Sequence, residues 1–527
     1  MNKDIITLPD NVEELKEIVK QLNTDKIYLK EQVAYLTNKL YGSKSEKIKK
    51  DDGPDLFNEA ETGVDKNIPE PEKIEVKYTR KKGKSGRKPI SDKFPRKEII
   101  IDIPEAEKIC ACGAKMERIG EETSEKLKVI PMQIEVEKHI RPKYACKCCQ
   151  GIESEGVHPT VKIAEVSPSI LPKTIATPSL LTYILINKFC DGLPFYRQEK
   201  IFSRLDLNIK RANMCNWTVR AYENLQALEK LLIGEMLNSF LIGIDETTVQ
   251  VLKEPDKPPE SKSYMWVFRG GMPKNPIILF HYDPSRSGNV PYEFLKNYKG
   301  RIQTDGYSGY NLLASVPDII HIGCWAHARR KFFDAIELLK SVKYDKAESL
   351  ADKIMDLISE LYENERFAKT NNFTREEITN FRQGKSKPIL LEIKKLLIEN
   401  QNKVLPQSKL GIAVNYTLSE WEKLIRYIDD GLIPIDNNMV ENAIRPFVIG
   451  RKNWLFYDTQ DGASASAFFY SLIETAKANG LEPYSYLNYI FEEFPKCKNE
   501  SDLEKLLPMF VDRTKIKNYS LPKSRCG

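Results

Sequence analysis

The centre of the chain begins with a strand-like stretch, residues 240–249, which reads FLIGIDETTV and carries an acid, Asp245, in its middle. The apolar residues before this acid predict a strand buried inside a sheet. Two further apolar runs, YMWVF at 264–268 and PIILF at 276–280, predict its neighbours. A buried carboxylate is costly unless it is paired or binds a metal, so Asp245 is a candidate metal ligand.

A second acid, Asp305, follows another predicted strand at 300–304. It lies where a sheet presents ligands, although most acids at such positions are caps or turn formers. The next short strand, at 319–322, leads into CWAHARRKF at 324–332, which opens a helix. Three strands followed by an alternation of strand and helix predict a mixed α/β sheet.

The third acid, Glu441, lies one turn into a predicted helix that is capped by Asp436 or Asn437. Arg445 lies four residues further on, and the simplest interpretation is a surface ion pair worth roughly a few tenths of a kcal/mol. The alternative is a functional role, in which Glu441 acts together with the two strand acids, Asp245 and Asp305. Three such carboxylates would hold two Mg²⁺ or Mn²⁺ ions and support in-line phosphoryl transfer.

The first 47 residues predict a helix with a seven-residue period, in which one heptad position is occupied by Leu15, Leu22, Leu29 and Leu36. Mostly aliphatic residues recur three positions before each leucine. This is the pattern of a parallel two-stranded coiled coil, so we expect a homo-oligomer formed through this zipper. The alternative is an amphipathic helix packed on its own domain.

The polar stretch that follows, 48–97, has no hydrophobic period and predicts a flexible linker. Its end, 77–97, holds ten Lys or Arg and one acid, a run that is either merely solvated or binds phosphates. The net charge of the 527 residues is only +6, so this distribution matters more than the total. Neither a membrane-length apolar run of about 20 residues nor a signal-like start is present, so we expect a cytoplasmic protein without a membrane partner.

Five of the ten cysteines fall in the stretch 98–160. In a cytosolic chain, clustered thiols predict metal binding before disulfides. Two knuckles would bring four thiolates to one Zn²⁺, and plain reduced thiols are the alternative. The predicted ligands are Cys110, Cys112, Cys146 and Cys149, and Cys148 is left open as a replacement for Cys149.

Residues 170–235 predict three helices, at 178–190, 194–204 and from 211 past 232. Two short helices, a turn and a long third helix suit a helix-turn-helix, and basic residues surround the turn. Any helical subdomain can share this pattern. A stretch at 332–430 is also helical in pattern almost throughout.

These motifs resemble those of the IS66-family transposases, which are DDE enzymes with an RNase H-like catalytic core. The resemblance covers nearly the whole chain, from the zipper and its end motif LYGSKSEK at 40–47 to the C-terminal piece at 471–480. Its most specific segments are DET at 245–247, TDGY at 304–307, the block at 324–332, and DNN at 436–438 with RP at 445–446. The first cysteine knuckle departs from the family pattern, since it reads C-x-C where many members have C-x-x-C.

The resemblance implies that Asp245, Asp305 and Glu441 are the catalytic acids, and that the helices at 332–430 are an insertion. It implies Mg²⁺ (or Mn²⁺) beside the Zn²⁺, cleavage at the element ends, and attack of the freed 3′-hydroxyl on target DNA in a prokaryotic cell. The expected partners are DNA and accessory proteins of the same element. The expected phosphate contacts are Arg197, Arg329, Arg330, Lys331, Arg445, Arg451 and Lys452. His327 is a further candidate, although a single His at a helix start is more often structural.

The whole chain is thus predicted to be a multidomain α/β protein. Its predicted parts are a coiled coil (1–47), a basic linker (48–97), a zinc-binding unit (98–160), a helical DNA-binding region (170–235), the catalytic core (236–460) and a C-terminal helical region (461–527). Two other functions fit the same residues: a catalytically inactive zinc-containing DNA-binding protein, and an RNase H-like nuclease without strand transfer. The three acids argue against the first, and an assay for joined products separates the second.

Overall fold

The computed structural model describes residues 133–145, 161–271, 274–339, 346 and 349–516, together with single positions and short runs between 11 and 33. The chain divides into two units. The first comprises Met1–Lys73 with Ile170–Ile516, and the second comprises Ile74–Ser169 with Lys517–Gly527.

A five-stranded sheet forms the centre of the first unit. Its strands are β3 (Leu241–Gln250), β4 (Lys262–Gly270), β5 (Ile277–Asp283), β6 (Gly300–Gln303) and β7 (Ile319–Ile322). Their order is β5-β4-β3-β6-β7. The pairs β3–β4 and β4–β5 are antiparallel, whereas β3–β6 and β6–β7 are parallel, so the prediction of a mixed sheet is confirmed.

Two long helices that follow the sheet in sequence pack back onto it: α13 (Asn438–Trp454) on β3 and β4, and α14 (Gln460–Ala478) on β5. The α14 hydroxyls satisfy the edge strand β5, because Ser471 Oγ accepts from the Phe280 N–H at 2.8 Å and Thr475 Oγ1 accepts from the Ile278 N–H at 3.0 Å. A helix therefore covers backbone groups that would otherwise form an open edge.

The region before the sheet is helical, as predicted. It contains α3 (Pro178–Phe189), α4 (Phe195–Ser203) and α5 (Arg211–Leu237). The α5 helix buries leucines at a spacing of three to four residues and packs against α14. The helical bounds agree with the sequence, whereas a helix-turn-helix role for them stays a prediction.

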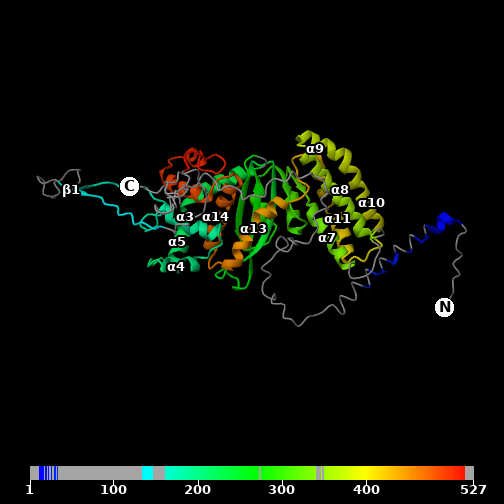
Figure 1. Cartoon of the computed structure of the whole chain (residues 1–527), viewed down its shortest axis with the longest axis horizontal. Helices are drawn as coiled ribbons and strands as arrows, with labels where there is room; N and C mark the ends of the chain where they lie inside the picture. The colour runs from blue at the N-terminus through cyan, green and yellow to red at the C-terminus, as the bar shows by residue number, and fades with distance from the viewer. Residues whose placement is uncertain are drawn as a thin grey trace, which may run out of the picture. The chain divides into compact units, whose positions relative to one another are not determined.

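The predicted helical stretch at 332–430 forms most of a second hydrophobic core, to which Leu241 of β3 and Ile322 of β7 also belong. Its helices α8, α10 and α11 lie beside α7 (Figure 1). Its buried side chains include Phe332, Ile354, Ile393 and Trp421. The elements are α7 (Trp325–Leu339), α8 (Leu350–Thr370), α9 (Arg375–Phe381), a π-helical turn (Arg382–Ser386), α10 (Lys387–Asn400), α11 (Lys409–Ser419), α12 (Trp421–Leu424) and a 3₁₀ turn (Ile425–Asp429).

Shorter elements complete the first unit: α6 (Asn289–Leu295), a 3₁₀ helix (Ser308–Ser315), α15 (Pro483–Glu493), a 3₁₀ turn (Phe494–Lys496) and α16 (Glu500–Glu504). Within the described part of the chain, no helix combines the length and apolar character needed to cross a membrane.

The second unit contains an antiparallel pair, β1 (Lys143–Ala145) with β2 (Val161–Ile163). All five clustered cysteines lie outside the described residues, as does the basic run at 77–97. At the N-terminus the described positions from 12 to 33 are helical, and Leu22 and Leu29 are exposed. Leu36 lies outside the described residues, and the coiled coil stays a prediction.

Candidate active site

Two of the predicted acids are brought side by side by the parallel pairing of β3 with β6. Gly243 of β3 lies beside Gln303 of β6. Asp245 and Asp305 each follow two residues later, so the same register places Asp245, in the middle of β3, at the level of Asp305, just beyond the end of β6. The N–H of Tyr307 donates to Asp305 Oδ1 at 2.9 Å and fixes that carboxylate where the strand ends.

The third acid, Glu441, reaches the sheet because the start of α13 packs very closely on β3. A Cβ atom at Gly243 would lie 2.6 Å from Asn437 Oδ1 and closer still to the Val440 side chain, so only glycine permits this approach. Asn437 is the N-cap residue of α13, but its side-chain amide donates to the Ile244 carbonyl at 3.0 Å instead of capping the helix. The hydrogen bond ties the start of α13 to the strand that carries Asp245.

The electrostatics of the three acids reflect their closeness. Burial raises the pKa of Asp245 well above its ordinary value, and the charges of Glu246, Asp305 and Glu441 raise it further. Burial likewise raises the pKa of Asp305 and of Glu441. Carboxylates that oppose one another's ionisation form a site with a strong preference for bound positive charge.

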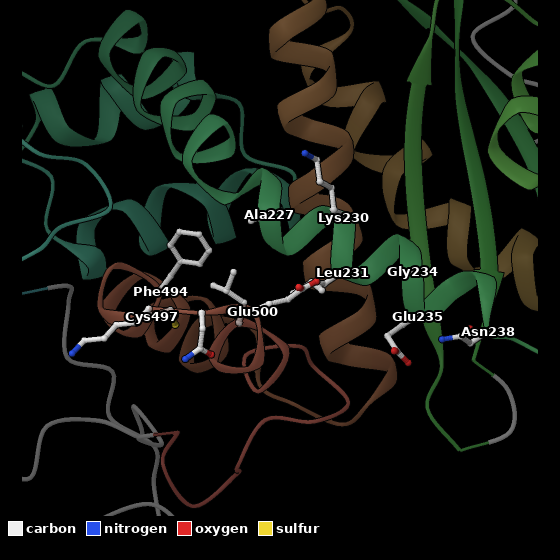
Figure 2. A pocket seen from close by; sticks show the side chains of 12 residues that line it. Ala227, Lys230, Leu231, Gly234, Glu235, Asn238, Phe494, Cys497 and Glu500 are labelled. Carbon is white, nitrogen blue, oxygen red and sulfur yellow. The ribbon is translucent and has the colours of Figure 1, made fainter. Parts of the chain in front are cut away.

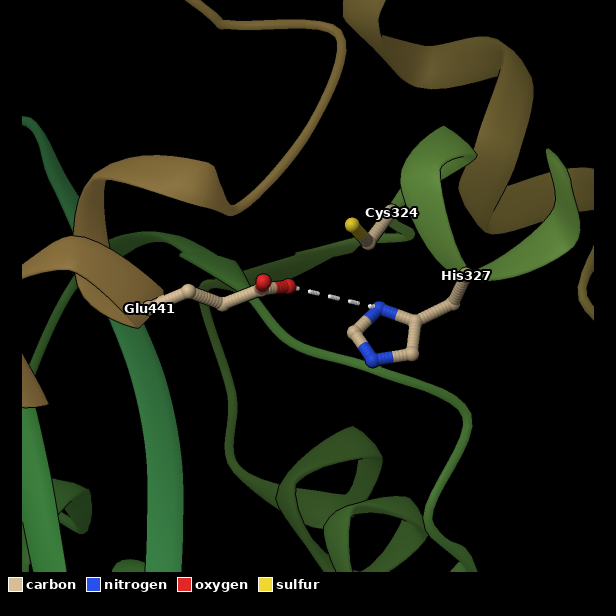
Figure 3. A group of neighbouring side chains, drawn as sticks. All are labelled: Cys324, His327 and Glu441. Carbon is tan, nitrogen blue, oxygen red and sulfur yellow. Dashed lines mark ion pairs between the residues drawn. The ribbon is translucent and has the colours of Figure 1, made fainter. Parts of the chain in front are cut away.

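Three groups surround the Glu441 carboxylate on the side of α7. His327 Nδ1 lies 4.0 Å from Oε1, and Arg330 Nη2 lies 3.9 Å from Oε2. Figure 3 shows His327 pointing at Glu441, with Cys324 next to them. The ligand atoms of Cys324, His327 and Glu441 all lie within 4.8 Å of one another. Glu441 therefore lies beside both the strand acids and a second group of side chains, Cys324 and His327, that could hold a metal ion.

The family follows from comparison with known proteins. Residues 173–465, more than half of the chain, match the family model described as "Transposase IS66 family". The chain belongs to the IS66 transposase family. Three further family models match in order along the chain: "Transposase C of IS166 homeodomain" at 28–99, "zinc-finger binding domain of transposase IS66" at 107–150, and "IS66 C-terminal element" at 471–509.

Similar full-length proteins occur in Sinorhizobium fredii (strain NBRC 101917 / NGR234). "Uncharacterized protein y4jD" is 30% identical over 515 residues, which cover 94% of this chain and 97% of the relative. "Uncharacterized protein y4qI" is 31% identical over 521 residues, which cover 94% of this chain and 91% of the relative. The family models identify transposase, zinc-finger and DNA-binding parts in this IS66-family chain. They support Zn²⁺ as a cofactor and DNA as a partner.

The basic residues predicted to contact phosphates take different places in the IS66 fold. Arg330 and Lys331 of α7 and Arg286 hold the pKa of Asp305 below the value that burial alone would give. Arg445 is exposed one turn after Glu441, and its positive charge lowers the pKa of Glu441. The guanidinium of Arg329 lies over the Tyr362 ring. Lys452 and Arg197 are exposed, on α13 and α4 respectively.

Arg451 is a correction to the predicted DNA contacts. Its side chain is 1% exposed, and its guanidinium donates to Thr247 Oγ1 at 2.9 Å and to the Thr248 carbonyl. The charge is used inside the protein, where it ties α13 to β3, and is not available to a phosphate. The helical period of α13 puts position 451 on the buried face that contains Phe447 and Trp454.

Two features of the site were not predicted from the sequence: a metal-ligand role for Cys324 and the partners of Glu246. Cys324 was quoted only as part of a motif, although its spacing of three residues before His327 at a helix start is typical of metal ligands. Glu246 is buried and paired, with Arg286 Nη2 at 2.7 Å and the Tyr310 hydroxyl on its other oxygen. Nothing in the sequence around Glu246 indicates that Arg286 and Tyr310 are its partners.

A separate cavity of about 820 Å³ lies between α5 and residues 494–503 (Figure 2). Its lining includes Lys230, Glu235, Asn238 and Cys497, and none of the three acids. The cavity is therefore separate from the acid cluster.

Proposed function

We propose that this IS66-family transposase is a DDE enzyme that cuts DNA at the ends of its element and joins the freed 3′-hydroxyl to target DNA. Asp245, Asp305 and Glu441 are the proposed catalytic acids. One observation carries the proposal: Asp245 on β3 lies at the level of Asp305, which follows the end of the parallel strand β6. The charges of Asp305 and of Glu441, from a facing helix, both raise the pKa of Asp245. A structural ion pair does not account for Asp245, because its neighbours Asp305 and Glu441 raise its pKa, whereas a basic partner would lower it.

The donor set fits a hard divalent cation. Carboxylate oxygens are the ligands that Mg²⁺ and Mn²⁺ prefer. Glu441 Oε1 is buried and has no hydrogen-bond partner among the described residues. Buried polar atoms normally have a partner, and a bound metal ion would supply one here. Held by these three residues, Mg²⁺ (or Mn²⁺) would supply activation of the attacking oxygen and stabilisation of the leaving oxygen in phosphoryl transfer.

The sheet supports an RNase H-like core. Three antiparallel strands continue into two parallel strands, and the first acid lies on the central strand β3. The third acid comes from a helix that follows a helical insertion, which forms most of a second hydrophobic core. This order of elements is what the proposed catalytic core (236–460) with its insertion (332–430) requires.

The protein's own side chains would bind and orient the DNA backbone. Arg330 and Lys331 lie where their charges act on Asp305, so a phosphate drawn to them would lie beside the acids. In cleavage a water oxygen attacks the phosphorus and the bond to the 3′-oxygen breaks, leaving a 3′-hydroxyl. In joining, that 3′-oxygen attacks a phosphorus of the target and displaces another 3′-oxygen.

The other parts of the chain are proposed to serve assembly and DNA binding. The zinc-finger match supports a zinc unit at 98–160, with Cys110, Cys112, Cys146 and Cys149 as the proposed ligands. The zipper (1–47) is proposed to form a homo-oligomer, and the basic linker and the helical region (170–235) to bind DNA. The protein would act on DNA in the cytoplasm of a prokaryotic cell, together with accessory proteins of its element.

The test is cleavage and joining of a labelled element end with Mg²⁺ or Mn²⁺. Asp305→Asn and Glu441→Gln should each keep folding and end binding but lose both reactions, because each removes a proposed metal ligand. Asp334→Asn, which changes an exposed acid on α7, is the matched control and should stay active. Full activity of either site variant would remove that residue from the catalytic set. Cleavage without joining in the unaltered protein would favour a nuclease instead.

A further inference from the structure

The Glu441 carboxylate belongs to two different sets of potential metal ligands. On one side are the strand acids Asp245 and Asp305, which offer only oxygen. On the other side are Cys324 and His327, which offer sulfur and nitrogen (Figure 3). No part of the proposed strand-transfer reaction uses this second set.

The second set has the geometry of a metal site. Cys324 comes directly before α7 and His327 lies in its first turn, so the two side chains share one face of the helix start. Their ligand atoms and a Glu441 oxygen lie within 4.8 Å of one another. Bond lengths of about 2.0–2.3 Å to Zn²⁺ place tetrahedral ligands roughly 3.3–3.8 Å apart, so shifts of about 1 Å would close the site.

The surroundings of each of these three side chains also fit a metal site. The N–H of Asn437 donates to Cys324 Sγ at 3.2 Å, and hydrogen bonds of this kind orient metal-binding sulfur atoms. Cys324 is fully buried, and the His327 and Glu441 side chains are only 12% and 11% exposed. Glu441 Oε1, which faces His327, is the oxygen that has no hydrogen-bond partner, whereas Oε2 faces Arg330.

We propose that Cys324, His327 and Glu441 bind a thiophilic divalent ion such as Zn²⁺, at a site distinct from the cysteine-rich unit. A set of sulfur, imidazole and carboxylate ligands selects Zn²⁺ or Co²⁺ and not Mg²⁺. Because this ion would bind Glu441 Oε1, the same oxygen that is proposed to bind Mg²⁺, occupation of this site withdraws that ligand atom from the strand acids. Inhibition of cleavage by Zn²⁺ follows, and this consequence rests on the proposed function, whereas the binding site does not.

Metal binding is tested on the full chain, loaded with Zn²⁺ and freed of excess by gel filtration. The wild type should hold about one Zn²⁺ more per chain than Cys324→Ser or His327→Gln. Co²⁺ added to protein whose cysteine-rich unit is already loaded with Zn²⁺ should give a thiolate-to-cobalt charge-transfer band. The band should vanish in Cys324→Ser and persist in Cys497→Ser, which alters a free cysteine elsewhere.

Both variants are chosen to keep the fold. The serine of Cys324→Ser can still accept a hydrogen bond from the Asn437 N–H, and His327→Gln leaves the Cys324 thiol in place. Equal zinc content in the wild type and both variants, or a cobalt band that survives in Cys324→Ser, would overturn the site. Loss of one ligand should raise the Zn²⁺ concentration for half-inhibition at least about tenfold, each variant being referred to its own Mg²⁺-supported cleavage. Equal inhibition of all forms would overturn the competition. A chain that never cleaves DNA would refute the proposed function, and the metal count would still decide the site.

Discussion

Replacing Gly243 with alanine should separate α13 from β3 and so move Glu441 away from the strand acids. The new Cβ would lie 2.6 Å from Asn437 Oδ1 and closer still to Val440, and both belong to the start of α13. Overpacking of this kind costs about 1–3 kcal/mol. Weakening the Asn437 hydrogen bond to the Ile244 carbonyl adds about 1 kcal/mol, so we expect a total of roughly 2–4 kcal/mol.

The activity of Gly243→Ala should fall further than its stability suggests. A displacement of about 1 Å at a catalytic group can cost about a hundredfold in rate, so we expect a loss of up to about that size in Mg²⁺-dependent cleavage. Urea unfolding measures the stability change, and a labelled element end measures cleavage. Gly234→Ala is the matched control. It lies in α5 with no heavy atom within 4 Å of the new Cβ, so it should gain about 0.5–1 kcal/mol and keep its activity. Wild-type stability and activity of Gly243→Ala would refute the close approach of α13 to β3.

Three further predictions concern the acids, the zipper and the zinc unit. Without added Mg²⁺, Asp245→Asn should raise the melting temperature, and more at pH 8 than at pH 5. Burial and neighbouring carboxylates raise the pKa of Asp245, so the stability that this group contributes to the wild type is fully present below its unfolded pKa of about 4 and is lost as the pH rises through its folded pKa. An increment that does not grow with pH would contradict this. Leu22→Glu with Leu29→Glu should make residues 1–45 monomeric in sedimentation, since each change places a charge in the seam. A wild-type fragment that is itself monomeric at tens of micromolar would count against the zipper. Cys149→Ser should lose one Zn²⁺ and unfold the zinc unit, whereas Cys148→Ser should keep the metal; the reverse result in metal analysis would assign Cys148 as the ligand.

The sequence by itself determined the elements and the candidate acids. The strand predicted at 240–249 is β3 at Leu241–Gln250, and the helix predicted at 178–190 is α3 at Pro178–Phe189. The period of the hydrophobic residues, and the glycine and proline residues that end an element, are local features of the sequence. Helices and strands can therefore be predicted without knowledge of the fold. Asp245 stood out for the same reason, because an acid inside an apolar strand has a local cost that asks for an explanation.

The tertiary structure alone decided which of these residues meet. Parallel pairing of β3 with β6 places Asp245 at the level of Asp305, which follows the end of β6. The missing side chain of Gly243 lets α13 approach closely enough to bring Glu441 to them. The same contacts turn Arg451 inward, where the sequence predicted a phosphate contact, and bring Cys324 to Glu441. Each of these outcomes depends on segments that are far apart in the chain, and the local period of a strand or helix carries no information about which distant face it will pack against.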